Sequence, residues 1–174
     1  MRAIGTVRHI VSPNKIHHLF LAAWADRWPD AKLYAPPGLA KRKRELHFHA
    51  ELGDNPEPAW AEDIDQTVFR GSIAMQEVVF FHRASSTAIV CDLVQRHDKA
   101  NMRGMKGLVM RIDGMVGEHG STPREWRATF VRRGPARAAR ARLLAWQPDR
   151  LVIAHGACAT EGATAILERA LAWI

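Results

Sequence analysis

The sequence contains two cysteines, Cys91 and Cys158, in 174 residues. So few cysteines exclude the disulfide framework of small secreted domains, and we expect both to be reduced thiols. The chain also lacks any apolar run of about 18 residues or more, which excludes an ordinary membrane-spanning helix. After Met1, the segment RAIGTVRHIV lacks the long apolar region and cleavage site of a secretory signal, so we expect a cytoplasmic protein.

The composition is that of an ordinary globular chain, with 47% hydrophobic and 25% charged residues. It contains no internal repeat and no low-complexity linker, so we expect one domain over residues 1–174 with one sizeable core.

The chain is basic, with a net charge of +7 and a pI of about 10.1. Basic residues gather in KRKR (41–44) and at Arg132, Arg133, Arg137, Arg140 and Arg142. They form either a phosphate-binding surface for nucleic acid or solvated helix faces. We favour solvated faces, because no aromatic residues are interleaved with these charges in the manner of an RNA-binding motif.

Short β-type segments alternate with helical ones along the chain. Predicted strands are 7–11, 31–35, 67–71, 77–82, 87–93 and 149–156. Predicted helices run from Ile16 to before Pro29, over 39–44, in a broken helical region over 95–146, and over 160–174. The strands 77–82 and 87–93 are almost continuously apolar, which predicts an α/β fold with a sheet covered on both faces.

Side chains of metal-ligand type stand at the ends of several predicted strands. His82, Asp92 and His155 each end a strand, and the pair His17-His18 follows the first strand within a few residues. Loops at one end of a sheet commonly form the functional cleft, where imidazoles and a carboxylate suit zinc, iron or manganese. Each residue alone is more often structural.

Two capping interpretations stay open beside the metal hypothesis. Asn14 is a candidate N-cap for the helix that follows it, or an oxygen ligand, and Asp92 could cap a helix beginning near Gln95. His47 and His49 could share one side of a strand, although a surface role is favoured. Cys158 lies three residues after His155 and could reach a shared metal, although we favour a small buried residue.

Four segments closely resemble an uncharacterised bacterial family, a domain of unknown function classed with the metallo-β-lactamase fold superfamily. They are VRHIVSPNKIHHLFLAAWADRWPDAKLYAPPGLAKR (7–42), DIDQTVFRG (63–71), EVVFFHRASSTAIVCDLV (77–94) and PDRLVIAHG (148–156). The resemblance covers almost the whole chain and implies a metallo-β-lactamase-like αββα sandwich. It also implies that His82 is the third-motif histidine, Asp92 the bridging carboxylate and His155 the final histidine before a turn.

The first motif of the superfamily, H-x-H-x-D-H, is only partly present. With His18 at its last position, His17 stands where the aspartate would be, and Pro13 and Lys15 stand where the first two histidines would be. The ligands that remain are His17, His18, His82, Asp92 and His155. They are enough for one divalent metal, zinc before iron or manganese, or for none, and the expected catalytic residues are Asp92 and His18.

The resemblance therefore implies a metal-dependent hydrolase acting on an unknown small molecule through metal-activated water. The alternatives are a non-catalytic scaffold, either metal-free or holding a structural metal, and a basic protein that interacts with nucleic acid. Sixteen residues precede His17, fewer than superfamily members usually have, so we expect a fold shortened at the N-terminus, with a helical insertion near 95–146. An uncovered sheet edge predicts a homodimer.

Overall fold

The structure is a computed structural model that describes residues 5–98, 100 and 104–174. Its strands are β1 (His9–Val11), β2 (Lys32–Ala35), β3 (Ala50–Glu51), β4 (Ile64–Phe69), β5 (Glu77–His82), β6 (Thr87–Val90) and β7 (Arg150–Ile153). Its helices are α1 (Leu21–Arg27), α2 (Leu39–Arg42), α3 (Gly104–Ile112), α4 (Arg124–Ala128), α5 (Arg133–Ala145) and α6 (Ala163–Ala170). None of the helices in the described part of the chain is long and apolar enough to cross a membrane.

The strands form two sheets. Sheet A has the order β1-β2-β3 with parallel pairing, and sheet B has the order β4-β5-β6-β7. In sheet B, β5 pairs antiparallel with both β4 and β6, while β6 pairs in parallel with β7. Parallel neighbours require a long crossover connection. The chain between β6 and β7 provides it and carries α3, α4 and α5.

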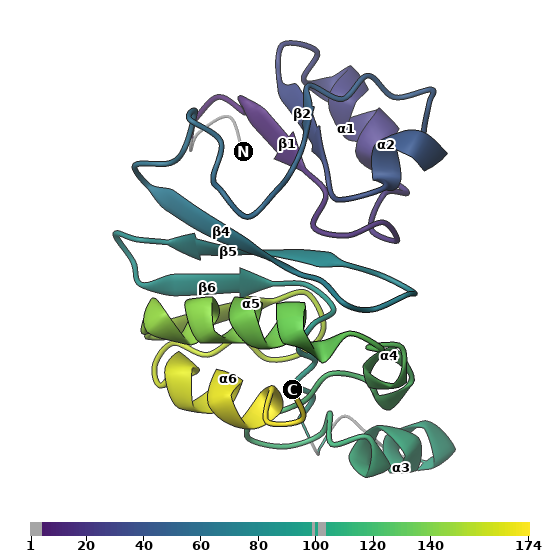
Figure 1. Cartoon of the computed structure of the whole chain (residues 1–174), viewed down its shortest axis with the longest axis vertical. Coiled ribbons are helices and arrows are strands. Elements are labelled where there is room, and N and C mark those ends of the chain that lie inside the picture. Colours follow the sequence, from purple (N-terminus) through teal and green to yellow (C-terminus); the bar gives the residue numbers. More distant parts are fainter. Residues whose placement is uncertain (1–4, 99, 101–103) are drawn as a thin grey trace.

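The elements stack in four layers, as Figure 1 shows. Helices α1 and α2 cover the outer side of sheet A, the two sheets lie against each other in the middle, and α5 and α6 cover the outer side of sheet B. The arrangement confirms the predicted α/β fold class and its αββα plan.

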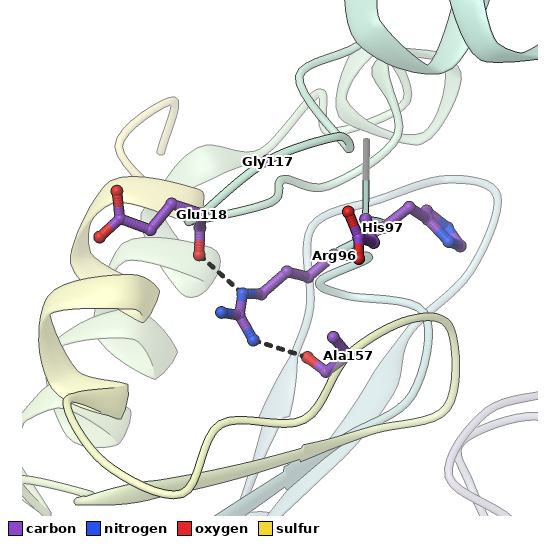
Figure 2. Close-up of a pocket in the computed structure, with 6 residues that line it drawn as sticks. Arg96, His97, Gly117, Glu118 and Ala157 are labelled. Atoms are coloured by element: carbon purple, nitrogen blue, oxygen red, sulfur yellow. Dashed lines mark hydrogen bonds between the residues drawn. The ribbon is translucent and has the colours of Figure 1, made fainter. Parts of the chain in front are cut away.

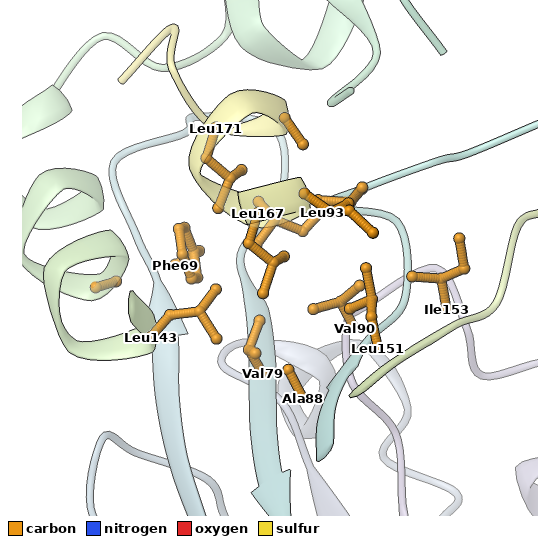
Figure 3. Close-up of a cluster of buried hydrophobic side chains, with 14 of the residues drawn as sticks. Phe69, Val79, Ala88, Val90, Leu93, Leu143, Leu151, Ile153, Leu167 and Leu171 are labelled. Carbon is orange, nitrogen blue, oxygen red and sulfur yellow. The ribbon is translucent and has the colours of Figure 1, made fainter. Parts of the chain in front are cut away.

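The main core lies between sheet B and the helices α5 and α6 (Figure 3). Alternate residues of neighbouring strands point into it, namely Ala88 and Val90 from β6 and Leu151 and Ile153 from β7. Leucines from the two helices meet them there. Because burial of one leucine side chain contributes about 1.5–3 kcal/mol, this layer fixes the β6–β7 pair on which the site is built.

The first helix begins later than the sequence pattern predicts. Residues 15–20 form turns, and α1 starts at Leu21, so the apolar stripe predicted over Ile16, Leu19, Phe20, Ala23 and Trp24 is not buried. The reason is local. Ser12 Oγ donates to the carbonyl of His17, which holds this segment in a turn that competes with helix formation.

Two other apolar surfaces are exposed. Helix α3 has its large apolar side chains in solvent, and Ile89 of β6 is paired in register with Val152 of β7, both exposed on the face of the sheet opposite the main core. In the sequence, Met102 stands at helical spacing from Met105, Leu108 and Val109, which predicts one apolar helix face, but Met102 lies outside the described residues. The homodimer stays a prediction.

Candidate metal centre

The topology of sheet B brings three functional segments to one edge. Val90 of β6 pairs with Ile153 of β7 in parallel, so Asp92 and His155, each two residues further on, leave the sheet side by side. Strand β5 runs the opposite way, which places its first residue, Glu77, at the same edge. The segment after β1 reaches this edge too, since Asn14 forms an isolated antiparallel bridge with Glu77.

Asp92 lies at the centre of the site, between two imidazoles. Nε2 of His17 lies 2.9 Å from Asp92 Oδ2, and Nε2 of His155 lies 2.9 Å from Asp92 Oδ1. The two rings are tilted against each other with centroids 5.5 Å apart. The side chain of Asp92 is 9% exposed, against 33% for His17 and 40% for His155. The Asp92 carboxylate therefore lies at the buried base of the site, and the two imidazoles lie closer to solvent.

Asn14 connects Asp92 to the segment that carries His17. Its side-chain nitrogen donates to Asp92 Oδ2 at 2.7 Å, and its side-chain oxygen accepts the backbone N–H groups of Ile16 and His17 at 3.1 and 3.2 Å. The predicted capping contacts of Asn14 are thus present, although they close a turn and not the start of a helix. Because the nitrogen of the amide contacts Asp92 and its oxygen contacts the backbone of His17, Asn14 fixes Asp92 relative to His17.

Glu77 anchors the site from below, and sequence reasoning did not single it out. It is fully buried. Its Oε1 accepts the backbone N–H groups of Cys91 and Leu93, and its Oε2 accepts the backbone N–H of Asp92 and the side-chain amide N–H of Asn14. Burial raises the pKa of Glu77 to about 7, against the effect of these donors. The signal in the sequence is a charged residue that opens an apolar strand, a position at which a buried carboxylate needs a specific partner.

Cys91 is the second site residue that sequence reasoning missed. Its thiol belongs to a group with His17, Asp92 and His155 in which one ligand atom from each residue lies within 4.8 Å of the others. Burial, together with the carboxylates of Glu77 and Asp92, raises the pKa of the Cys91 thiol well above its ordinary value. Cys158, for which the sequence favoured a small buried residue over a metal ligand, is exposed instead, because it follows the end of β7 in a surface loop, and its Sγ faces the carbonyl of Ile153.

Two of the predicted ligands lie outside this group. His82 closes β5, and because Glu77 opens the same strand at the site, His82 lies roughly 16 Å away at the opposite edge of the sheet. There its Nδ1 is hydrogen-bonded to Ser85 Oγ at 2.7 Å. His18 turns its Nδ1 to the carbonyl of Lys15 at 3.0 Å. The structure brings together His17, Asp92 and His155 of the predicted set, and it does not bring His18 or His82 to them.

His155 is held in place through its backbone. The carbonyl of His155 accepts the N–H of Arg96 at 3.1 Å, and a β-bridge joins Arg96 to Gly156. Figure 2 shows the Arg96 guanidinium extended between two loops, where it donates to the carbonyls of Glu118 and Ala157 at 2.6 and 2.9 Å. The pocket of about 320 Å³ beside it is therefore lined by an arginine engaged with main-chain carbonyls.

Two pockets with largely apolar linings border the cluster. A pocket of about 690 Å³ reaches His17 and is lined mainly by apolar side chains, among them Leu19, Phe20 and Trp24. A second pocket of about 430 Å³ reaches Asp92 and includes Met75 and Trp126. Ile16 lines both pockets. The polar cluster thus borders two largely apolar pockets that share Ile16.

Three of the arginines proposed for a phosphate surface have partners within the described chain. Arg142 is paired with Asp65 at 2.8 Å, Arg133 donates to the carbonyl of Trp173, and Arg140 donates to that of Glu168. These contacts hold helix α5 in place. They support the interpretation of this arginine-rich helix as a partly solvated, structural face.

The donor chemistry of the cluster fits a divalent metal. Two Nε2 atoms and a carboxylate are the ligands that zinc, iron and manganese use, and ligands of a tetrahedral zinc ion lie about 3.3–3.8 Å from one another. The atoms of the cluster, all within 4.8 Å, need shifts of about 1 Å or less to reach that geometry. His17, Asp92 and His155 would hold the ion.

Comparison with solved structures identifies the fold. The DIM-1 metallo-β-lactamase matches 94% of this chain over 66% of its own length, with a TM-score of 0.58 and 14% identity. A metallo-β-lactamase from Pontibacter korlensis covers 99% of the chain over 71% of its own (TM-score 0.61, 12% identity), and one from Hirschia baltica covers 98% over 69% (0.59, 12%). The chain has a metallo-β-lactamase fold.

The chain spans about two thirds of the length of these metallo-β-lactamases. No family model and no curated protein matches the sequence. At 12–14% identity the likeness shows the fold alone. Membership of a bacterial family of unknown function stays a prediction, because the comparison shows the fold and not the family. The activity is therefore argued from the site.

Proposed function

We propose that this protein is a metal-dependent hydrolase with a single divalent ion, zinc first, held by His17, Asp92 and His155. The observation that carries the proposal is the convergence of two Nε2 atoms from distant loops on one buried carboxylate, each at 2.9 Å. When bound, such an ion polarises a carbonyl or phosphoryl group and supplies a nucleophile from water at neutral pH. The other site residues position these groups.

Asp92 is the residue best placed to act as a general base. Its Oδ2 is fixed by the Asn14 amide, while Oδ1 faces only His155 among its hydrogen-bonding contacts in the described chain. Oδ1 is therefore the atom that would accept a proton from an attacking water. His18, the other residue expected in catalysis, is hydrogen-bonded through Nδ1 to the carbonyl of Lys15, lies outside the group of possible ligands, and has no part in this proposal.

The apolar surfaces favour substrates with apolar groups beside the scissile bond. Exposed Ile16 separates two pockets that lead to His17 and Asp92, so a small ester, lactone or phosphodiester could lie across the cluster with an apolar group on either side. A substrate with charged groups on both sides of the scissile bond would lose the hydration of those groups in these apolar pockets and would find no polar partner for them there.

The test combines metal analysis with a substrate screen. Purified untagged protein, reconstituted with zinc, iron or manganese, is expected to hold about one ion per chain and to hydrolyse apolar nitrophenyl esters, lactones or phosphodiesters. Asp92→Ala should lose the metal and the activity while its circular dichroism spectrum is retained. Absence of metal after reconstitution would overturn the proposal, and bound metal without hydrolysis of any substrate class would leave a structural-metal scaffold.

A further inference from the structure

The thiol of Cys91 is buried and directed into the candidate metal centre. The residue is 6% exposed and lies at the end of β6, next to Asp92. Its backbone is fixed, because its N–H donates to Glu77 Oε1 at 2.9 Å. Its Sγ lies within 4.8 Å of the ligand atoms of His17, Asp92 and His155.

The surroundings of this sulfur differ from those of a packing cysteine. A buried structural cysteine normally behaves as a small hydrophobe among aliphatic side chains. Cys91 instead faces two imidazole nitrogens and a carboxylate, and within the described chain its Sγ takes part in none of the hydrogen bonds found. By contrast, Cys158 lies at the surface. The Cys91 thiol is therefore a buried polar group at this site that has no hydrogen-bond partner among the described residues.

We infer that Cys91 Sγ is a fourth protein ligand of the metal, and that the resulting set of two histidines, one aspartate and one cysteine selects a thiophilic ion. The inference rests on the metal site of the proposed function and deepens it. Thiolate is a soft ligand that favours zinc over manganese and magnesium, which prefer oxygen. As the metal–sulfur bond forms, the S–H proton leaves to solvent.

Such a set still leaves room for a reactant. Cys91 and Asp92 are the buried ligands, whereas the side chains of His17 and His155 are 33% and 40% exposed. A reactant could therefore approach the site from solvent, on the side of the two partly exposed imidazoles. Zinc sites expand to five ligands during reaction, so four protein ligands do not close the site.

The test uses cobalt as a spectroscopic substitute for zinc in the full-length chain. Wild-type protein loaded with cobalt is expected to show a thiolate-to-cobalt charge-transfer band in the near ultraviolet. The band should be lost in Cys91→Ser and Cys91→Ala and retained in the control Cys158→Ala. Competition with a chelator should show zinc affinity at least tenfold weaker in both Cys91 variants, because even outer-shell partners change affinity by roughly 10–100-fold. Manganese affinity should change little.

The outcomes separate this inference from the proposed function. Stoichiometric cobalt without the charge-transfer band in wild-type protein would overturn the thiolate ligand and leave the metal site intact. Loss of the band in Cys158→Ala would also overturn it, by assigning the sulfur to the other cysteine. A folded wild-type chain that binds no cobalt, zinc or manganese would overturn the proposed function itself. Since the wild-type spectrum is decisive, the test does not depend on the variants folding.

Discussion

The side-chain nitrogen of Asn14 lies 2.7 Å from Asp92 Oδ2 and 3.0 Å from Glu77 Oε2, so one amide donates to two buried carboxylates. The oxygen of the same amide accepts the backbone N–H groups of Ile16 and His17. Only a side chain with donors on one end and an acceptor on the other satisfies all four contacts. This requirement explains why a neutral amide occupies the position.

Asn14→Asp should therefore destabilise the protein although the two side chains have the same shape. The substitution removes both donors and adds a third carboxylate beside Glu77 and Asp92, and leaving buried charged groups without partners costs about 2–4 kcal/mol. Guanidinium unfolding of the metal-free protein at pH 8 measures the loss. The exposed Asn55→Asp is the control and should change stability by less than about 0.5 kcal/mol. Equal stability of the two variants would refute the bridging role of Asn14.

Glu77→Gln tests the anchor below the site. Both carboxylate oxygens accept hydrogen bonds, so the NH₂ group of glutamine must face N–H donors whichever way it is turned. We expect a loss of about 2–4 kcal/mol in unfolding free energy, from two or more unpaired buried donors. Thermal and urea unfolding check this. In the exposed control Glu161→Gln, stability should stay within about 0.5 kcal/mol of wild type; a similarly small effect of Glu77→Gln would contradict the network.

The four histidines of the predicted site should divide into two pairs. His17→Ala and His155→Ala are expected to lower the bound zinc from about one ion per chain to below roughly 0.2, because each removes an Nε2 atom next to Asp92. His18→Ala and His82→Ala should keep the full metal content, since their rings are hydrogen-bonded elsewhere. Elemental analysis of all four dialysed proteins decides. Metal loss in His82→Ala would show that β5 contributes a ligand from its far end, against this geometry.

Much of the fold follows from the sequence pattern. The continuous apolar run of β5 predicts a strand covered on both faces, as is observed, whereas the similar run of β6 leaves Ile89 exposed on one face. The alternation of strands with helices predicts the α/β class. Asp92 and His155 were recognisable as site residues because each follows a buried strand. Their proximity depends on the parallel pairing of β6 with β7, which local propensity does not encode.

The position of His82, far from the other predicted site residues, has a topological cause. A histidine that ends a strand is near the site only if that strand runs toward it, and β5 is antiparallel to β6. The residue at the site is then the first of the strand, Glu77, whose role depends on four long-range donors that no local pattern reveals. Cys91 was missed for a similar reason, since an apolar run predicts burial of the thiol and not its neighbours.

Gly156→Ala should disturb the loop that carries His155. Gly156 has φ of +122°, and a Cβ there would lie 1.9 Å from the carbonyl oxygen of Arg96, a backbone atom with little freedom to move. We expect a loss of at least about 2 kcal/mol in stability, together with weaker zinc binding, because His155 must shift with its neighbour. Gly53→Ala, where a Cβ meets nothing within 4 Å, is the matched control. Zinc affinity equal in the two variants would separate this loop from the metal site.

Asp65 gives a prediction about acid stability at a distance from the site. Burial alone would raise its pKa, but the Gln66 backbone N–H and the Arg142 guanidinium lower the pKa of Asp65 below its usual 3.8. A depressed folded-state pKa means that the carboxylate stabilises the protein above the unfolded-state value and that this contribution is lost as the pH falls through the lower folded-state pKa. Asp65→Asn should thus cost about 1–3 kcal/mol at pH 7, and the difference from wild type should shrink as the pH falls below about 4. Urea unfolding between pH 2.5 and pH 7 measures this difference in stability, with the exposed Asp30→Asn as control. A difference that stays constant with pH would show that the charge of Asp65 does not stabilise the contact between β4 and α5.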